Sequence, residues 1–154
     1  MRLDDQPDVR KDTMSRKMAA ASAVILMAGG LSLATSGSAN AAGSCTIGRS
    51  VNGGGGNTGY TLTVPAASNN SVDCTLSAGA SNNAVRALQT ALVRCGKQNI
   101  TVDGVFGNGT KNALINVQRA RGVTADGIYG NNTRNAMLWP WKTSNHSKCD
   151  TYYS

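Results

Sequence analysis

The sequence contains one pattern twice, and this internal repeat constrains the fold more than any other feature. Residues 103–110 read Asp-Gly-Val-Phe-Gly-Asn-Gly-Thr, and residues 126–133 read Asp-Gly-Ile-Tyr-Gly-Asn-Asn-Thr. The second copy begins 23 residues after the first (126 − 103). Each copy runs into a segment with helical character, at residues 111–121 and 134–139, and a third such segment lies at residues 84–95. A repeat of this kind defines one supersecondary unit that the fold uses twice.

The residue types in the repeat predict a turn followed by the start of a helix. Asp-Gly marks a turn because Asp hydrogen-bonds nearby backbone and Gly adopts a positive φ without steric penalty. The aliphatic and aromatic residues that follow are expected to pack in the core, and the second Gly opens the helix. The Thr falls in the first helical turn, where its hydroxyl can satisfy an unpaired backbone N–H. A structural role is therefore predicted for Asp103, Gly104, Phe106, Gly107, Thr110, Asp126, Gly127, Gly130 and Thr133.

Residues 1–41 have the composition of a secretory signal peptide. An apolar run at residues 19–33 follows Arg16 and Lys17, and it is succeeded by small residues ending Ser-Ala-Asn-Ala-Ala. This order predicts export with cleavage after Ala41. A membrane anchor is disfavoured because a span needs about 20 apolar residues, and Ser and Gly interrupt this run. We therefore expect a secreted protein of the cell wall or extracellular space, with no membrane contact after cleavage.

All the cysteines lie beyond the predicted cleavage site, at Cys45, Cys74, Cys95 and Cys149. Their even number predicts two disulfides, and the absence of Cys-x-x-Cys spacing argues against a metal site. The helix from Asn82 to Cys95 spans about 20 Å, and the chain from Cys74 to Asn82 can reach about 26 Å. The chain can therefore fold back along the helix, which favours Cys74–Cys95 with Cys45–Cys149. The pairing Cys45–Cys74 with Cys95–Cys149 is the runner-up.

The composition divides the mature chain into three parts. Residues 42–75 include a run of glycines and a short alternating segment, which predict an arm with little regular structure and at most one hairpin. Residues 76–139 hold the helical segments and predict the folded domain, whose small core would need the disulfides for stability. Residues 140–154 are predicted to form a C-terminal tail tethered through a disulfide at Cys149. The predicted fold class is mainly α, a small three-helix bundle.

Several separate blocks between residues 79 and 139 share the order and spacing of one known family. They are Val85-Arg-Ala-Leu-Gln89, the first repeat, Ala113-Leu114 with Gln118, and Gly122-Val123 followed by Ala125 and the second repeat. These blocks resemble the type-1 peptidoglycan-binding domain. The resemblance implies a three-helix bundle that is usually a wall-targeting module attached to a cell-wall hydrolase. Val117 and Arg134 depart from the family pattern, which commonly has aromatic residues at those positions.

The residues needed for wall hydrolysis are missing from the mature sequence. It has one histidine, His146, whereas a zinc peptidase or amidase needs several ligands at set spacings. A glycosidase usually needs paired carboxylates, and the only ones here are Asp73, Asp103, Asp126 and Asp150. Disulfide-bonded cysteines cannot act as nucleophiles. The sequence predicts a protein that is not an enzyme and holds no metal or cofactor.

The mature chain is basic, with ten Lys and Arg against four Asp. The basic residues of its domain could be solvated helix faces, or could attract a polyanion such as an anionic wall polymer or stem-peptide carboxylates. Nucleic acid is a poor alternative because export separates the protein from it and no reader motif is present. The basic residues in question are Arg86, Arg94, Lys97, Lys111, Arg119, Arg121 and Arg134.

The repeats themselves predict where a ligand binds, because a helix start offers free N–H groups and partial positive charge. The exposed candidates nearest these starts are Asn108, Lys111, Tyr129, Asn131, Asn132 and Arg134. Lys111 and Arg134 are expected to form the cationic rim of a groove between the repeats, and Arg86 and Arg94 to matter less. Tyr129 could instead belong to the core, as Phe106 should.

The sequence therefore predicts a secreted, disulfide-stapled, non-catalytic protein that associates with cell-wall peptidoglycan. Two alternatives stay open. One is a secreted protein-interaction or inhibitor module, and the other is a regulatory partner of a separate wall hydrolase.

Overall fold

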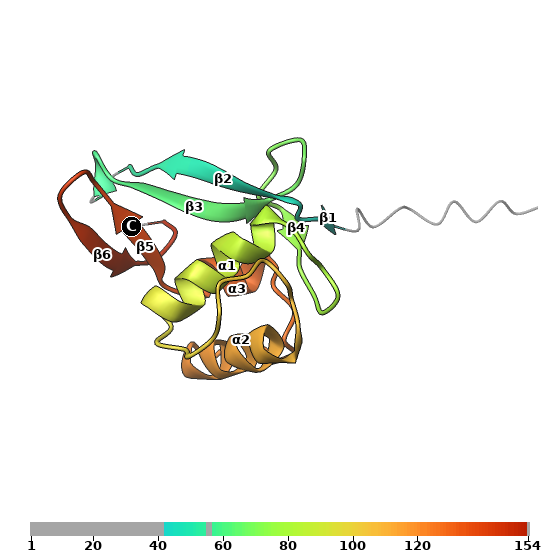
Figure 1. Ribbon diagram of the computed structural model, residues 1–154. Coiled ribbons are helices and arrows are strands. Elements are labelled where there is room, and N and C mark those ends of the chain that lie inside the picture. Colours follow the sequence, from blue (N-terminus) through green and yellow to red (C-terminus); the bar gives the residue numbers. More distant parts are fainter. Residues whose placement is uncertain (1–41, 55–56, 154) are drawn as a thin grey trace, which may run out of the picture. The chain divides into compact units, whose positions relative to one another are not determined.

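The computed structural model describes residues 42–54 and 57–153, and the predicted signal peptide lies outside them. The described residues form three α-helices: α1 (Asn83–Arg94), α2 (Asn108–Ala120) and α3 (Asn131–Ala136). The strands are β1 (Gly43–Ser44), β2 (Ile47–Asn52), β3 (Thr61–Ala66), β4 (Cys74–Thr75), β5 (Trp139–Lys142) and β6 (Ser147–Asp150). They form a four-stranded antiparallel sheet in the order β2-β3-β5-β6 and a parallel β1-β4 pair. Helix α1 lies between the larger sheet and α2 (Figure 1).

The predicted fold class, a mainly α three-helix bundle, is wrong, because strand and helix occupy similar shares of the described residues, about 27% and 29%. The segment predicted as an arm with at most one hairpin does contain a hairpin, β2–β3, which pairs Ile47 with Ala66 and Asn52 with Thr61. Leu62 and Val64 on β3 are buried while Thr63 between them is exposed, the alternation typical of a half-buried strand. This alternation is visible in the sequence of β3, whereas its partner strand β2 has no comparable pattern and was not predicted.

The C-terminal part of the chain is also a correction. The third helix was expected to run to residue 139, but α3 ends at Ala136 and Met137 is extended. Trp139 and Trp141 are both buried and point to the same side of β5, so this segment follows the period of a strand. The expected tail therefore forms a β5–β6 hairpin that joins the sheet through β3.

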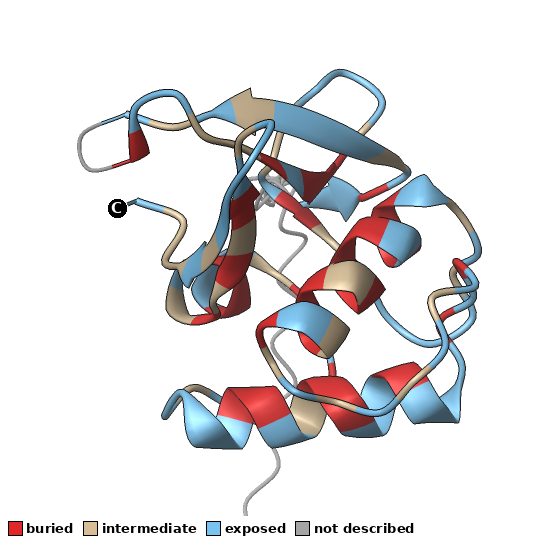
Figure 2. Ribbon diagram, turned by 60° about the vertical axis from the view of Figure 1, so that its left-hand side comes forward, coloured by how far each residue is buried: buried red, intermediate tan, exposed pale blue. Residues whose placement is uncertain are grey.

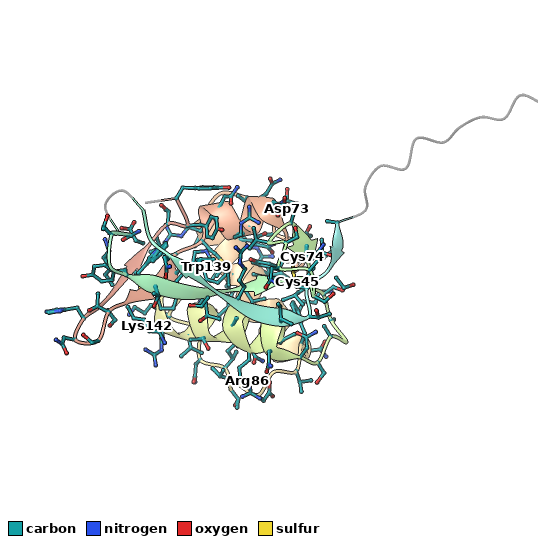
Figure 3. The ribbon with its side chains drawn as sticks, turned by 90° about the horizontal axis from the view of Figure 1, so that it is seen from above. Cys45, Asp73, Cys74, Arg86, Trp139 and Lys142 are labelled. Atoms are coloured by element: carbon teal, nitrogen blue, oxygen red, sulfur yellow. A yellow bond between two sulfur atoms is a disulfide. The ribbon has the colours of Figure 1, made fainter. Side chains whose placement is uncertain are left out.

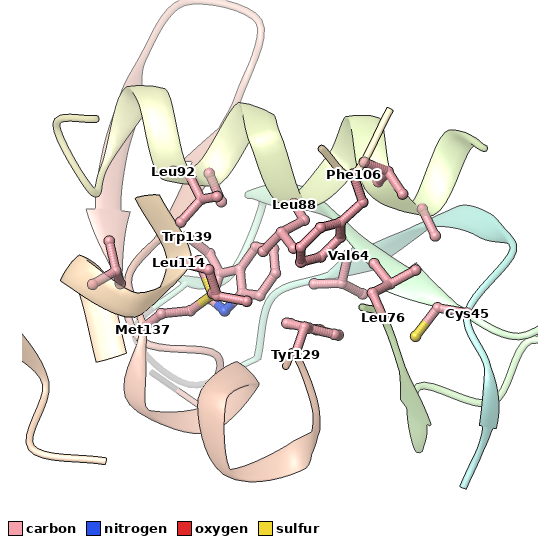
Figure 4. Packing of buried hydrophobic residues seen from close by; sticks show 14 of the residues in the cluster. Cys45, Val64, Leu76, Leu88, Leu92, Phe106, Leu114, Tyr129, Met137 and Trp139 are labelled. Atoms are coloured by element: carbon pink, nitrogen blue, oxygen red, sulfur yellow. The ribbon is translucent and has the colours of Figure 1, made fainter. Parts of the chain in front are cut away.

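One core unites the sheet and the helices. Helix α1 is capped by Asn82, whose side chain accepts a hydrogen bond from the Val85 N–H at 3.1 Å. It buries an apolar face against β2, β3 and β5, and the buried residues of α2 lie on the side that faces α1 (Figure 2). Leu88, Leu114, Tyr129 and Trp139 meet in the centre of this core (Figure 4). The sheet thus supplies apolar surface that three short helices alone would lack.

The disulfides are Cys45–Cys74 and Cys95–Cys149, so the favoured pairing of Cys74 with Cys95 is wrong and the runner-up is confirmed. Cys45 and Cys74 lie together because β1 pairs with β4 (Figure 3). The chain from Cys74 leads directly to the start of α1 instead of folding back along it, and Cys95 is at the opposite end of that helix. Within the described residues, no helix has the length and apolar character needed to cross a membrane.

Candidate ligand-binding site

A buried glutamine organises the first repeat. The Gln89 side-chain amide donates to Asp103 Oδ1 at 2.8 Å and to Thr110 Oγ1 at 3.0 Å, and its oxygen accepts from the Gly104 N–H at 2.7 Å. Asp103 Oδ1 also accepts from the Val105 N–H at 2.8 Å, which closes the turn. Gly104 has φ +83°, the left-handed conformation that favours glycine. Helix α1 therefore holds the loop that begins α2.

The second repeat has the same network around Gln118 of α2. Its amide donates to Asp126 Oδ1 at 3.0 Å and to Thr133 Oγ1 at 3.1 Å, and its oxygen accepts from the Gly127 N–H at 2.9 Å. The Ile128 N–H donates to Asp126 Oδ1 at 2.8 Å. The predicted turns at both Asp residues thus form in the structure.

The role expected of the two threonines is corrected by these contacts. Each hydroxyl accepts from a glutamine amide and donates to a loop carbonyl, that of Val105 or Ile128, instead of satisfying a helix N–H. The organising role of Gln89 and Gln118 was not predicted from the sequence. The available signal was a glutamine on the apolar face of the helix before each repeat, where a polar residue needs partners.

Hydrogen bonding in the first loop also lowers the pKa of the Asp103 carboxyl group. The Val105 N–H and then the Gln89 amide stabilise the charged form of Asp103, so its pKa lies below the ordinary value of 3.8. The nearby Arg86 guanidinium acts in the same direction, and it donates to the carbonyls of Val102 and Asp103. Asp103 is thus ionised when the loop is formed.

Four of the six predicted ligand residues lie on the surface as expected: Asn108, Lys111, Asn131 and Asn132. The other two are buried: the expected exposure of Arg134 is wrong, and Tyr129 belongs to the core, as the alternative for that residue held. Tyr129 is fully buried, packs edge-to-face on Trp139, and has a raised pKa because burial disfavours the phenolate. Its hydroxyl has no hydrogen-bond partner among the described residues.

Arg134 is buried because it holds α3 to the segment before β4. Its guanidinium donates to the Val72 carbonyl at 2.6 Å and to Asp73 Oδ1 at 3.3 Å, and it lies 4.9 Å from the centre of the Tyr152 ring. It cannot form an exposed rim with Lys111. The Lys111 stem instead covers Gly127, where an added Cβ would lie 2.7 Å from its Cγ.

The surface formed by the described residues has several hollows, and two of them are candidate ligand sites. The smaller, of about 310 Å³, lies beside the second repeat and includes Asn131, Asn132, Thr124 and Ile128. The larger, of about 460 Å³, lies between α1 and the sheet, away from both repeats. The smaller hollow coincides with part of the predicted site, whereas the larger one was not expected.

The described residues contain no cluster of three or more His, Cys, Asp or Glu that could hold a metal ion. His146 is exposed in the turn between β5 and β6. Both disulfides are formed and the described cysteines include no free thiol. The polar groups of the two hollows suit binding through hydrogen bonds and charge.

Comparison with known proteins identifies the helical part of the chain. Residues 81–137 match the family described as "Putative peptidoglycan binding domain". This segment belongs to that family. The match confirms the resemblance seen in the sequence, and the matched segment contains both glutamine-centred loops.

Two solved structures are similar to the chain. One is a peptidoglycan-binding protein from Clostridioides difficile in complex with glutamine hydroxamate, at 28% identity and a TM-score of 0.41, with 48% of this chain and 46% of that chain covered. The other is the N-terminal domain of SleB, at 41% identity and a TM-score of 0.38, with 40% of this chain and 84% of that chain covered. The chain thus spans less than half of the Clostridioides difficile protein. Curated proteins give no match.

Proposed function

We propose that this protein is secreted and binds cell-wall peptidoglycan without catalysing a reaction. The observation that carries the proposal is the family match over residues 81–137. Two disulfides support an oxidising location outside the cell, and the sequence at residues 1–41 supports export. We place the contact with peptidoglycan at the hollow beside the second repeat, whose lining includes Asp126 and Ile128. Lys111 packs on Gly127, between these two residues in the chain.

The chemistry of this hollow suits the peptide part of peptidoglycan. Asn131 and Asn132 offer amide donors and acceptors, and Ile128 offers an apolar contact because its side chain is 45% exposed. Lys111 adds a positive charge nearby that can attract a stem-peptide carboxylate. A few polar groups around an apolar surface are typical of small-ligand sites.

Sedimentation with purified insoluble peptidoglycan, stripped of its anionic polymers, tests the proposal. We expect the mature protein to sediment with the wall, and Asn132→Ala combined with Lys111→Glu to reduce the bound fraction about tenfold. Asn112→Ala combined with Arg119→Glu makes matched changes elsewhere on α2 and should bind like the wild type. Wild-type protein that stays in the supernatant would contradict peptidoglycan binding and favour a protein-interaction module or a hydrolase partner.

A further inference from the structure

The groove between α1 and the sheet is lined by positive charge and by no acidic side chain. Arg86 and Arg94 line the groove from α1, and Lys142 of β5 lies on the other side. The Arg86 guanidinium already donates to the carbonyls of Val102 and Asp103, so Arg94 and Lys142 are the main charged groups for a ligand. Within the described residues, neither Arg94 nor Lys142 forms an ion pair. In Figure 3, Arg86 and Lys142 lie toward one side of the view and Asp73 toward the other. The groove is therefore a concentrated cationic surface.

The cations follow a line along the helix. Arg86, Thr90 and Arg94 are four residues apart and share one face of α1, so the two guanidinium groups begin about 12 Å apart along its axis. An adjoining hollow of about 300 Å³, different from the one beside the second repeat, shares Arg94, Pro140 and Ser147 with the groove and adds Lys97 beyond the end of α1. Such a row suits a ligand with repeated negative charges better than one with a single carboxylate.

The wall opposite α1 is supplied by strands outside the family segment. Gly48 of β2 forms part of the floor, where an added Cβ would lie 3.1 Å from Thr63 Cγ2 and 3.4 Å from the Asn83 carbonyl oxygen. The Cys95–Cys149 disulfide joins the end of α1 to β6, which holds the β5–β6 hairpin beside the groove. Close packing at Gly48 and the Cys95–Cys149 disulfide therefore hold the two walls of the groove in place.

We propose that this groove binds a linear anionic polymer whose backbone contains phosphate diesters. Arg guanidinium groups recognise phosphate through paired hydrogen bonds, and a row of exposed cations attracts a polyanion over a distance. The choice of a wall polymer as the ligand rests on the proposed cell-wall location. The row of positive charges is observed in the structure and does not depend on that proposal. The site is separate from the hollow proposed for peptidoglycan, so the two ligands do not compete for the same residues.

Binding of soluble poly(glycerol phosphate), measured by calorimetry at low salt, tests this proposal. Arg94→Ala combined with Lys142→Ala should weaken binding about tenfold, and added salt should reduce the difference because it screens exposed charges. Arg119→Ala combined with Arg121→Ala removes the same charge from α2 and should change affinity less than about threefold. Equal losses from both pairs would show diffuse attraction and overturn the groove.

A steric variant separates the groove from its charge. Thr90 lines the groove between the two arginines, so Thr90→Trp fills it without changing the net charge. We expect this variant to lose poly(glycerol phosphate) binding at least tenfold while thermal melts confirm that it folds. Unchanged binding by Thr90→Trp, or equal affinity of the wild type for single-stranded RNA, would overturn the proposal.

The two proposals fail in distinguishable ways. Arg94→Ala with Lys142→Ala should sediment normally with peptidoglycan that carries no phosphate polymer. Poly(glycerol phosphate) binding without sedimentation would reject only the proposed peptidoglycan function. Sedimentation without any binding of the soluble polymer would reject only the groove assignment.

Discussion

The two glutamine-centred loops share one local structure but have different surroundings. In both, a glutamine from the preceding helix binds the Asp, the Gly and the Thr of the repeat with closely similar distances. The first loop leads into the 13-residue helix α2, whereas the second leads into the six-residue helix α3 and then into the sheet. The same short sequence thus forms the same turn twice, and the surrounding residues determine which elements each turn connects.

Corresponding side chains show this difference most clearly. The residue after the first Thr is the exposed Lys111, and the residue after the second is the buried Arg134. The aromatic positions differ as well, since Phe106 is apolar while Tyr129 places a hydroxyl in the core. The segment before α1 pairs with both loops, through Ala80 to Phe106 and through Leu76 to Tyr129. One repeat serves as a helix start, and the other also anchors the sheet.

The largest expected effect tests whether the two networks are equivalent. Gln89→Ala and Gln118→Ala each remove a buried side chain and several hydrogen bonds, and should lower the free energy of unfolding by about 3 kcal/mol. Chemical denaturation of both variants measures this. Gln98→Ala, at a half-buried position, is the control and should cost less than about 1 kcal/mol. A much larger loss of stability in one of these two variants than in the other would show that the two loops are not equivalent.

The second prediction sharpens the contrast between Lys111 and Arg134. Arg134→Ala leaves the Val72 carbonyl without its donor and should cost about 2 kcal/mol, a modest figure because Asp73 is well exposed. Lys111→Ala should cost less than about 1 kcal/mol because its charge is solvated. Thermal melts of the two variants compare them directly, and equal losses would contradict the buried role of Arg134.

Substitutions at the two aromatic positions should change the free energy of unfolding by a smaller amount and in opposite directions. Tyr129→Phe removes a buried hydroxyl that has no partner among the described residues, and should stabilise the fold by about 1 kcal/mol. Phe106→Tyr introduces a hydroxyl at a buried position and should destabilise it by about 1 kcal/mol. Denaturant midpoints read both changes. A loss of stability in Tyr129→Phe would mean that the hydroxyl is satisfied in solution.

The smallest effect is a pH dependence at the first loop. Because the pKa of Asp103 is lowered in the folded state, its contribution to stability is fully present above the unfolded value and is lost as pH falls through the folded one. Asp103→Asn should therefore flatten the acid limb of the curve of stability against pH. Denaturation at a series of pH values below neutrality measures the slope, and identical slopes for wild type and variant would refute this linkage.

Much of the local structure could be predicted from the repeat. The Asp-Gly turns and the helix starts depend on residues close together in the chain, so their hydrogen bonds follow from residue type and spacing. The family segment could be identified for the same reason. The candidate site was predicted in part, since Asn131 and Asn132 border the hollow at the second repeat.

The amino-acid sequence is enough to predict the repeated turns, the helices that follow them and the possibility of two disulfides. Long-range packing sets which cysteines pair, that β2 joins β3, and that Arg134 is buried while Lys111 is exposed. These features depend on contacts between segments far apart in the chain, such as Arg134 with Val72 and Cys95 with Cys149. A local pattern does not encode such contacts, because they form only where the whole fold brings the partners together.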